Sequence, residues 1–229
     1  MTSPSIPYNL HADPITALKE LCDAYPTQVV FTTSFGIEDQ VLTDLIFRNN
    51  LNVRLATLDT GRLFPETYNL IDKTKSRYDL EIESYFPDTL SLEEFVNSQG
   101  MNSIFKSIES RKTCCSIRKI DPLFRALEDS SVWVTGLRME QSKNRSDINR
   151  ISVDSLSGIL KFNPLITWSD ADIEDYIEKH NVPINILHKK GFPSIGCAPC
   201  TRAISPNEHP RAGRWWWEHS SQECGLHKG

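Results

Sequence analysis

The chain has 229 residues, of which 39% are hydrophobic, enough to bury the core of one fairly large domain. Its 30 acidic and 25 basic residues give a net charge of −5, which argues against a general nucleic-acid-binding protein. No apolar run approaches the roughly 18 residues of a membrane span, and the N-terminus lacks the pattern of a signal peptide. We therefore expect a cytoplasmic protein that binds neither nucleic acid nor membrane.

The first half of the chain alternates helical and strand patterns. Helical spacing of apolar residues covers 15–24, 38–49 and a stretch beginning near Pro65, and strand patterns cover 28–32, 53–58, 80–85 and 132–135. This alternation predicts an α/β fold with a mostly parallel sheet flanked by helices. Ligands of such sheets bind beyond the carboxyl ends of the strands, where the polar turns 33–36 and 59–62 are expected.

After about residue 150 the pattern changes. Residues 151–153 and 159–162 flank a polar segment and predict a hairpin. Ser169, with Asp172 three residues later, is typical of a helix N-terminus, and we expect that helix to end at Lys179.

Beyond Pro183 the chain is rich in Gly, Pro, His, Arg and Trp, which predicts an irregular C-terminal lobe. No linker-like stretch marks a boundary. We therefore expect a single domain over residues 1–229, with a flexible C-terminal segment from about 205 to 229.

Four of the six cysteines form two pairs, Cys114-Cys115 and the Cys-x-x-Cys motif of Cys197 and Cys200. Adjacent cysteines cannot easily close a normal disulfide, and in a reducing compartment spaced cysteines more often bind metal or act in catalysis. Four soft ligands suit zinc or a 4Fe–4S cluster. Tandem cysteines are unusual in zinc sites, which favours the cluster. Two unrelated buried pairs are the alternative.

Cationic residues surround the tandem pair. Lys112, Arg118 and Lys119 would stabilise an anionic cluster, or else are solvated surface charges. Lys119 lies one helical turn beyond Cys115 and can therefore reach the same site.

Cys224 stands apart, five residues from the end of the sequence, in a polar segment where burial is not expected. Four basic residues near it in sequence can lower its pKa, which would make it a nucleophile; they are Arg211, Arg214, His219 and His227. An idle terminal cysteine is the alternative. Cys22 lies on an apolar helical face and is predicted to belong to the core.

The segment of residues 33–36 joins a predicted strand to a predicted helix, whose N-terminus can receive an anion. It lacks the lysine of a Walker motif. Residues 58–61, at the next strand end, add polar groups for a nucleotide. Arg138, Arg145, Arg211 and Arg214 can clamp phosphate or sulfate, although any single arginine can also be solvated at the surface.

Together these motifs resemble those of the assimilatory sulfonucleotide reductases, specifically the iron–sulfur adenylyl-sulfate (APS) reductases. The resemblance runs from about Thr32 to His227. The segments that carry it are residues 33–39, 58–64, 112–115 with 118–119, 136–138, 197–200 and 223–227. The double-cysteine plus Cys-x-x-Cys set is highly specific, and the terminal Glu-Cys-Gly-Leu-His motif is more so.

The resemblance implies a fold like that of ATP-pyrophosphatase and adenine nucleotide alpha hydrolase domains. It implies that Cys224 attacks the sulfur of adenosine 5′-phosphosulfate, displaces AMP and forms an S-sulfocysteine, from which thioredoxin or a glutaredoxin-like reductant releases sulfite. It assigns a 4Fe–4S cluster to Cys114, Cys115, Cys197 and Cys200. Family members are often homo-oligomers, so a homo-oligomer is one option, and the sequence leaves the oligomeric state open.

The residue patterns and the resemblance together give one set of predicted substrate-binding residues. These are Thr33, Ser34, Phe35, Gly36, Leu58, Asp59, Thr60, Gly61, Lys119, Gly136, Arg138, Arg145, Arg211, Arg214 and His227. Phe35 departs from members with a Ser-x-Ser-Gly loop, which leaves open whether Thr33 or Ser34 meets the phosphate.

Three alternatives remain at this point. The first is reduction of the 3′-phosphorylated substrate PAPS, alone or together with APS. The second is an ATP-using adenylating or thiolation enzyme, although its typical Ser-Gly-Gly-x-Asp-Ser loop is absent from residues 33–39. The third is a non-catalytic zinc module, which leaves Cys224 and the anion-binding turn unexplained.

Overall fold

The computed structural model describes residues 10, 13–141 and 148–218. Its helices are α1 (Pro14–Ala24), α2 (Ile37–Arg48), α3 (Pro65–Tyr78), α4 (Thr89–Gln99), α5 (Ile108–Cys115), α6 (Asp121–Leu127) and α7 (Asp170–His180). Its strands are β1 (Val29–Thr33), β2 (Arg54–Leu58), β3 (Glu83–Tyr85), β4 (Val132–Val134), β5 (Ile151–Val153) and β6 (Leu160–Phe162). Short 3₁₀ helices cover Ser103–Phe105, Met139–Gln141, Ile186–Lys190 and Ala198–Cys200.

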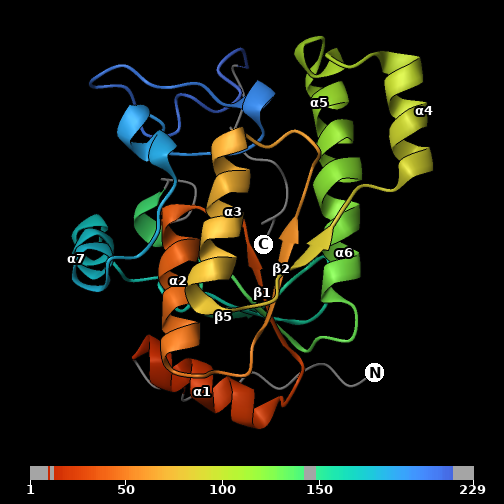
Figure 1. Ribbon diagram of the computed structural model, residues 1–229. Coiled ribbons are helices and arrows are strands. Elements are labelled where there is room, and N and C mark those ends of the chain that lie inside the picture. Colours follow the sequence, from red (N-terminus) through yellow and green to blue (C-terminus); the bar gives the residue numbers. More distant parts are fainter. Residues whose placement is uncertain (1–9, 11–12, 142–147, 219–229) are drawn as a thin grey trace.

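The described strands form one sheet in the order β3-β2-β1-β4-β6-β5. Neighbouring strands are parallel except for β5 and β6, which form the antiparallel hairpin predicted from the sequence. The α/β class and the mostly parallel sheet are therefore confirmed. Because all parallel strands run the same way, their carboxyl ends meet at one edge, which is where the turns after β1 and β2 lie (Figure 1).

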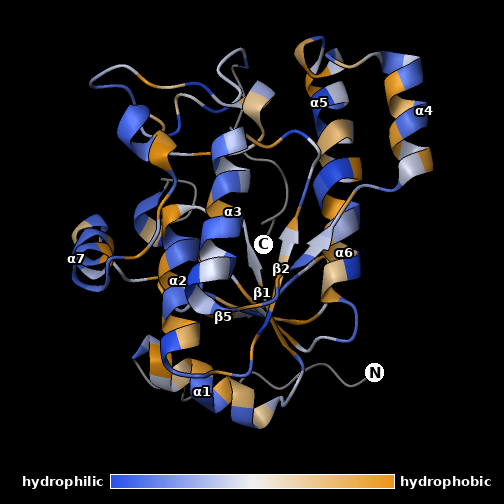
Figure 2. Ribbon diagram, in the orientation of Figure 1, coloured by the Kyte–Doolittle hydropathy of each residue, from blue (hydrophilic) through white to orange (hydrophobic). Residues whose placement is uncertain are grey.

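Helices cover both faces of the sheet, and alternating residues of β1 show how. Phe31 belongs to the core cluster shared with α1, α2 and α3, whereas Val30 packs with residues of α6 on the opposite face. Both side chains are fully buried. In Figure 2 the side of α3 that faces the viewer is largely hydrophilic, as expected for a helix that covers a sheet.

Several predicted boundaries of helices and strands are close to the observed ones, and one strand is shorter than predicted. β3 covers only Glu83–Tyr85, although Leu80 and Ile82 of the predicted stretch are buried. Their apolar side chains pack into the core before the backbone joins the sheet. At α7, Ser169 and Asp172 form the predicted N-terminal cap as a full capping box, and the helix ends one residue later than predicted, at His180.

Helices α5 and α6 form one continuous column with a π-helical stretch, Ser116–Ile120, between them (Figure 1). The Asp121 N–H donates to the Ser116 carbonyl, five residues back, which is the π-helical pattern. This stretch directly follows Cys115 and carries Lys119. Such widened turns occur often at functional sites.

Among the residues that the structure describes, no helix has the length and apolar character needed to cross a membrane.

Candidate active site

A cavity of about 540 Å³ opens at the carboxyl ends of β1, β2 and β4. Of the predicted substrate-binding residues, those that line it are Thr33, Ser34, Phe35, Gly36, Leu58, Thr60, Lys119, Gly136, Arg138, Arg211 and Arg214. The fold thus brings together segments that are far apart in the sequence, at the place where parallel sheets bind ligands.

The turn between β1 and α2 forms one wall of this cavity. Phe35 is buried, and its φ of +59° lies in the left-handed region that non-glycine residues rarely adopt. Its N–H donates to Thr33 Oγ1 (3.0 Å), while the Ser34 hydroxyl donates to the Asp39 carboxylate (2.7 Å). α2 begins after Gly36 without a side-chain cap, so its first turn offers backbone N–H groups to an anion.

Gly136 follows β4 and permits a close approach to that turn. A Cβ atom at this position would lie 2.2 Å from Asp39 Oδ1 and 3.3 Å from Glu38 Cβ. The absence of a side chain at residue 136 is therefore a steric requirement for seating the first turn of α2 against the end of β4.

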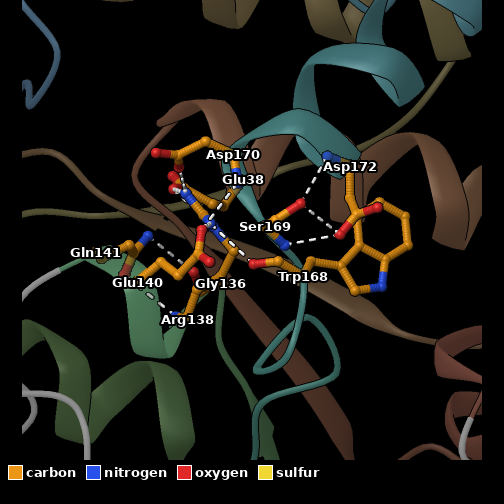
Figure 3. A network of polar contacts seen from close by, with 9 residues as sticks. All are labelled: Glu38, Gly136, Arg138, Glu140, Gln141, Trp168, Ser169, Asp170 and Asp172. Atoms are coloured by element: carbon orange, nitrogen blue, oxygen red, sulfur yellow. Dashed lines mark hydrogen bonds and ion pairs between the residues drawn. The ribbon is translucent and has the colours of Figure 1, made fainter.

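Arg138 lines the cavity, but its guanidinium is engaged by the protein (Figure 3). Nη2 donates to Glu38 (2.9 Å) and Asp170 (2.5 Å), Nη1 donates to the Trp168 carbonyl (2.9 Å), and Nε donates to Glu38 (3.2 Å). Burial alone would lower the pKa of Arg138, but Asp170 and Glu38 raise it above its ordinary value. This arginine joins α2 to α7, and its charge is neutralised within the fold.

Arg214 lines the same cavity, but its surroundings differ from those of Arg138. It is 7% exposed, and its Nη1 donates to Ser194 Oγ (3.1 Å) and to the Ile195 carbonyl (3.4 Å). Within the described part of the chain it has no carboxylate partner, and its Nε is buried without a hydrogen-bond acceptor. A buried, unneutralised guanidinium at a cavity wall is a receptor for an anion.

A second, small cavity is lined by all four paired cysteines. Cys114 and Cys115 come from the end of α5, and Cys197 and Cys200 come from the segment of the 3₁₀ helix Ala198–Cys200. All four thiols are buried and unbridged. Arg62, Arg111, Arg118 and Lys119 also line this four-thiol cavity.

The electrostatic surroundings of the thiols differ. Burial raises the pKa of Cys114, and it raises the pKa of Cys200 to about 12. For Cys197 burial acts in the same direction, but Lys119, Thr60, Arg214 and Arg118 outweigh it and lower its pKa. The Cys197 thiol also donates a hydrogen bond to Thr60 Oγ1 (3.3 Å).

The donor set fits a cluster held by thiolates. Four soft ligands share one buried cavity with cations that offset their negative charge, as Cys₄ iron–sulfur sites require. Among the described residues, no three His, Cys, Asp or Glu side chains form a group that could hold a single metal ion.

Lys119 and Cys197 line both cavities. The four-thiol cavity and the larger cavity therefore share a wall, and a cation stands at that wall. Lys112, in contrast, is exposed and lines neither cavity, as expected for a solvated surface charge.

The remaining predicted residues lie elsewhere. Asp59 accepts hydrogen bonds from the Gly61 N–H and from the Tyr68 hydroxyl (both 2.8 Å), so it organises the turn after β2. Neither Asp59 nor Gly61 lines the cavity. Arg145, Cys224 and His227 lie outside the described residues.

Sequence reasoning missed other residues of the two cavities. His188 and Ser194 line the larger cavity, and the fully buried Arg111 lines the four-thiol cavity. Burial disfavours the charged form of a histidine, and it lowers the pKa of His188. The only local signal was the position of His188 and Ser194 just before the Cys-x-x-Cys motif.

Comparison with known proteins assigns the family. Residues 28–203 match the family described as the phosphoadenosine phosphosulfate reductase domain. The chain belongs to this family. A curated relative named adenosine 5′-phosphosulfate reductase, from Rhizobium meliloti (strain 1021), is 49% identical over 87% of this chain and 76% of its own length.

Solved structures agree with this assignment. The phosphoadenylyl-sulfate (PAPS) reductase from Candida auris, in its phosphate complex, superposes with a TM-score of 0.70 at 31% identity and covers 81% of this chain and 88% of its own. FMN adenylyltransferase from Candida glabrata, in complex with FAD and inorganic pyrophosphate, gives a TM-score of 0.57 at 17% identity, covering 94% of this chain and 76% of its own. The latter similarity concerns the fold alone, and it agrees with the mostly parallel α/β architecture.

Proposed function

We propose that this enzyme reduces adenosine 5′-phosphosulfate to sulfite and AMP in assimilatory sulfate reduction. It is an adenylyl-sulfate reductase, an oxidoreductase that acts on a sulfur group. Family membership and the names of the relatives support this reaction. The main observation is the shared wall, where a nucleotide-sized cavity adjoins four buried thiols and contains Arg214, which no described carboxylate neutralises.

The 5′-phosphate is assigned to the turn that precedes α2. A phosphate oxygen needs hydrogen-bond donors, and the first turn of α2 supplies backbone N–H groups. The Ser34 proton is already directed to Asp39, whereas the Thr33 oxygen accepts a bond and retains its own proton. We therefore assign the hydroxyl contact to Thr33.

The cationic side of the cavity is assigned to the sulfate and to the adjoining oxygens of the 5′-phosphate. Arg211, Arg214 and Lys119 line this side. A thiolate that attacks a sulfate ester is repelled by the sulfonyl oxygens, and cations placed beside those oxygens offset this repulsion in the transition state. Arg145 and His227 are proposed as further contacts from the resemblance.

Cys224 is proposed as the nucleophile. Its thiolate attacks the sulfur of the sulfonyl group, a sulfur–sulfur bond forms, and the bond from sulfur to the phosphate oxygen breaks with its electron pair leaving on AMP. A thiolate of thioredoxin, or of a glutaredoxin-like protein, then attacks the Cys224 sulfur, and sulfite leaves with the electron pair. The second thiol of the reductant resolves the mixed disulfide, so both electrons come from thiols.

Cys114, Cys115, Cys197 and Cys200 are proposed to hold a 4Fe–4S cluster. When bound, it would supply a fixed charge beside Lys119 and a covalent tie between α5 and the Cys-x-x-Cys segment. Lys119 then stands between the thiol ligands and the sulfate, where its ammonium group orients the sulfonyl oxygens. Because the reaction consumes a thiol reductant, we propose the cytoplasm as its compartment.

The choice between APS and PAPS as substrate can be tested by measuring sulfite release. The assay uses reduced thioredoxin and anaerobically purified protein, with APS or PAPS as substrate. We expect much faster turnover of APS. Comparable or faster turnover of PAPS would mean that the cavity accommodates a 3′-phosphate and that this chain is a PAPS or dual-substrate reductase.

The covalent step has a separate test. Incubation with APS in the absence of reductant should add the mass of one SO₃ group to the peptide that contains Cys224, and the Cys224→Ser variant should show no adduct and no turnover. An adduct on Cys22, or full activity of Cys224→Ser, would contradict the assignment.

A further inference from the structure

The ring of Trp215 contacts two guanidinium groups. The centroid of its ring is 4.9 Å from the Arg111 Cζ and 4.7 Å from the Arg214 Cζ. Trp215 and Arg111 are each 1% exposed, and Arg214 is 7% exposed. Cation–π contacts are strongest when both partners are desolvated, as they are here. The three residues therefore form a buried stack, Arg111–Trp215–Arg214.

The Arg111 end of the stack is fixed by charge. Arg111 donates to both carboxylate oxygens of Glu218, at 2.9 and 2.7 Å, and both side chains are almost fully buried. Arg111 also lines the four-thiol cavity. Hydrogen bonding to Glu218 is the main cause that raises its pKa, and the neighbouring Cys115 thiol adds to it. This arginine is neutralised and held in one orientation.

The Arg214 end is held differently. Its described contacts are the Trp215 ring, the Ser194 hydroxyl and the Ile195 carbonyl, and no described carboxylate neutralises it. Gly196 makes room for it, because a Cβ there would lie 2.4 Å from Nη2. A neutral aromatic face thus orients this guanidinium while its charge remains available to an anion in the larger cavity.

The backbone ties the stack to the Cys-x-x-Cys segment. The Trp215 N–H donates to the Cys200 carbonyl (3.2 Å), and Arg214 forms an isolated antiparallel bridge with Thr201. Trp215 also has a φ of +43°, in the left-handed region. A non-glycine residue is held there only when its surroundings determine its position, and such residues cluster at functional sites.

We propose that Trp215 is a positioning residue that holds Arg214 at the cavity wall and thereby sets the affinity for the anionic end of the nucleotide. This role deepens the proposed function and rests on it for the identity of the substrate. It links two parts of the molecule: Arg111 and the cysteine segment fix the indole, and the indole fixes the arginine that receives the anion.

The test compares two adjacent tryptophans. Trp215→Leu removes the stacked ring, and Trp216→Leu is the matched control because Trp216 is 42% exposed and lines neither cavity. The readouts are the dissociation constant of AMP by calorimetry, the KM and kcat for APS, and the iron content of the anaerobically purified protein. AMP binding needs no turnover, so it decides the positioning role even if the proposed reaction fails.

We expect Trp215→Leu to weaken AMP binding and raise the KM for APS by roughly tenfold, with iron content retained and kcat less affected. Trp215→Phe keeps an aromatic face and should recover most of the affinity. Unchanged AMP binding in Trp215→Leu, or an equal loss in Trp216→Leu, would overturn the proposal.

A double-mutant cycle separates positioning from general destabilisation. If Trp215 acts through Arg214, Trp215→Leu has no further effect on AMP affinity in the Arg214→Gln background. Additive losses in the double variant would contradict this coupling, whether or not the single variants are less stable.

Discussion

Arg138 and Arg214 line the same cavity, and each is less than a tenth exposed, yet they have opposite surroundings. Arg138 donates to two carboxylates and a carbonyl through every guanidinium nitrogen (Figure 3). Arg214 contacts a hydroxyl, a carbonyl and an indole, and no carboxylate among the described residues. The partners of a buried arginine, and not its place in a cavity, therefore decide whether its charge stabilises the fold or can bind a ligand.

The largest effect on stability is expected from removing the ion pairs of Arg138. Arg138→Gln leaves the Glu38 side chain, which is only 14% exposed, without its partner, so the free energy of unfolding should fall by roughly 3–5 kcal/mol. Urea unfolding followed by circular dichroism measures this. Arg202→Gln is the control, because the Arg202–Glu208 pair is partly exposed and should contribute much less. Equal losses of unfolding free energy in the two variants would contradict a special structural role for Arg138.

Arg214→Gln should show the reverse profile. A charge-assisted hydrogen bond to an anion contributes about 1.5–3 kcal/mol, so AMP should bind roughly 10- to 150-fold more weakly. The free energy of unfolding should change little, because no carboxylate among the described residues loses a partner. Calorimetric titration with AMP and the same urea series provide both numbers. Normal AMP affinity with a large loss of stability would show that the two arginines do not differ in role.

Gly136→Ala tests the close contact between the end of β4 and the first turn of α2, which carries Glu38, the partner of Arg138. The added methyl group would meet Asp39 Oδ1 at 2.2 Å, so the first turn of α2 must shift, at a cost of about 1–3 kcal/mol in unfolding free energy. Gly36→Ala serves as the steric control, since its Cβ would come no closer than 3.4 Å to the Ser34 hydroxyl. Thermal and urea unfolding of both variants should separate them, and similar stabilities would argue against the steric requirement.

The smallest expected effect concerns pH. Burial lowers the pKa of His188 below its ordinary value of 6.5, while Glu38 acts in the opposite direction. The unfolded chain therefore binds more protons than the folded one just below pH 6.5, and stability falls as the pH drops through this window. His188→Gln should reduce that fall by less than about 1 kcal/mol per pH unit. Unfolding measured at pH 7.5 and 5.5 checks it, and an unchanged pH dependence would contradict it.

The regular elements were predictable where the signal is local. The Ser169–Asp172 cap and the hairpin of β5 and β6 depend on residues a few positions apart, and both were confirmed. β3 was predicted too long, because Leu80 and Ile82 are buried outside the sheet. The π-helical stretch after Cys115 left no recognisable pattern, since a single widened turn changes no periodicity.

Residue types and short spacings were enough to predict the two cysteine pairs, the alternation of strands and helices in the first half of the chain, and the family. Which cations are neutralised became clear only from the folded structure. The partners of Arg138 lie 100 and 32 residues away in the chain, and the Trp215 ring that orients Arg214 is itself fixed by Arg111. Electrostatic interactions depend on distance in space and on burial, and neither can be read from separation along the chain.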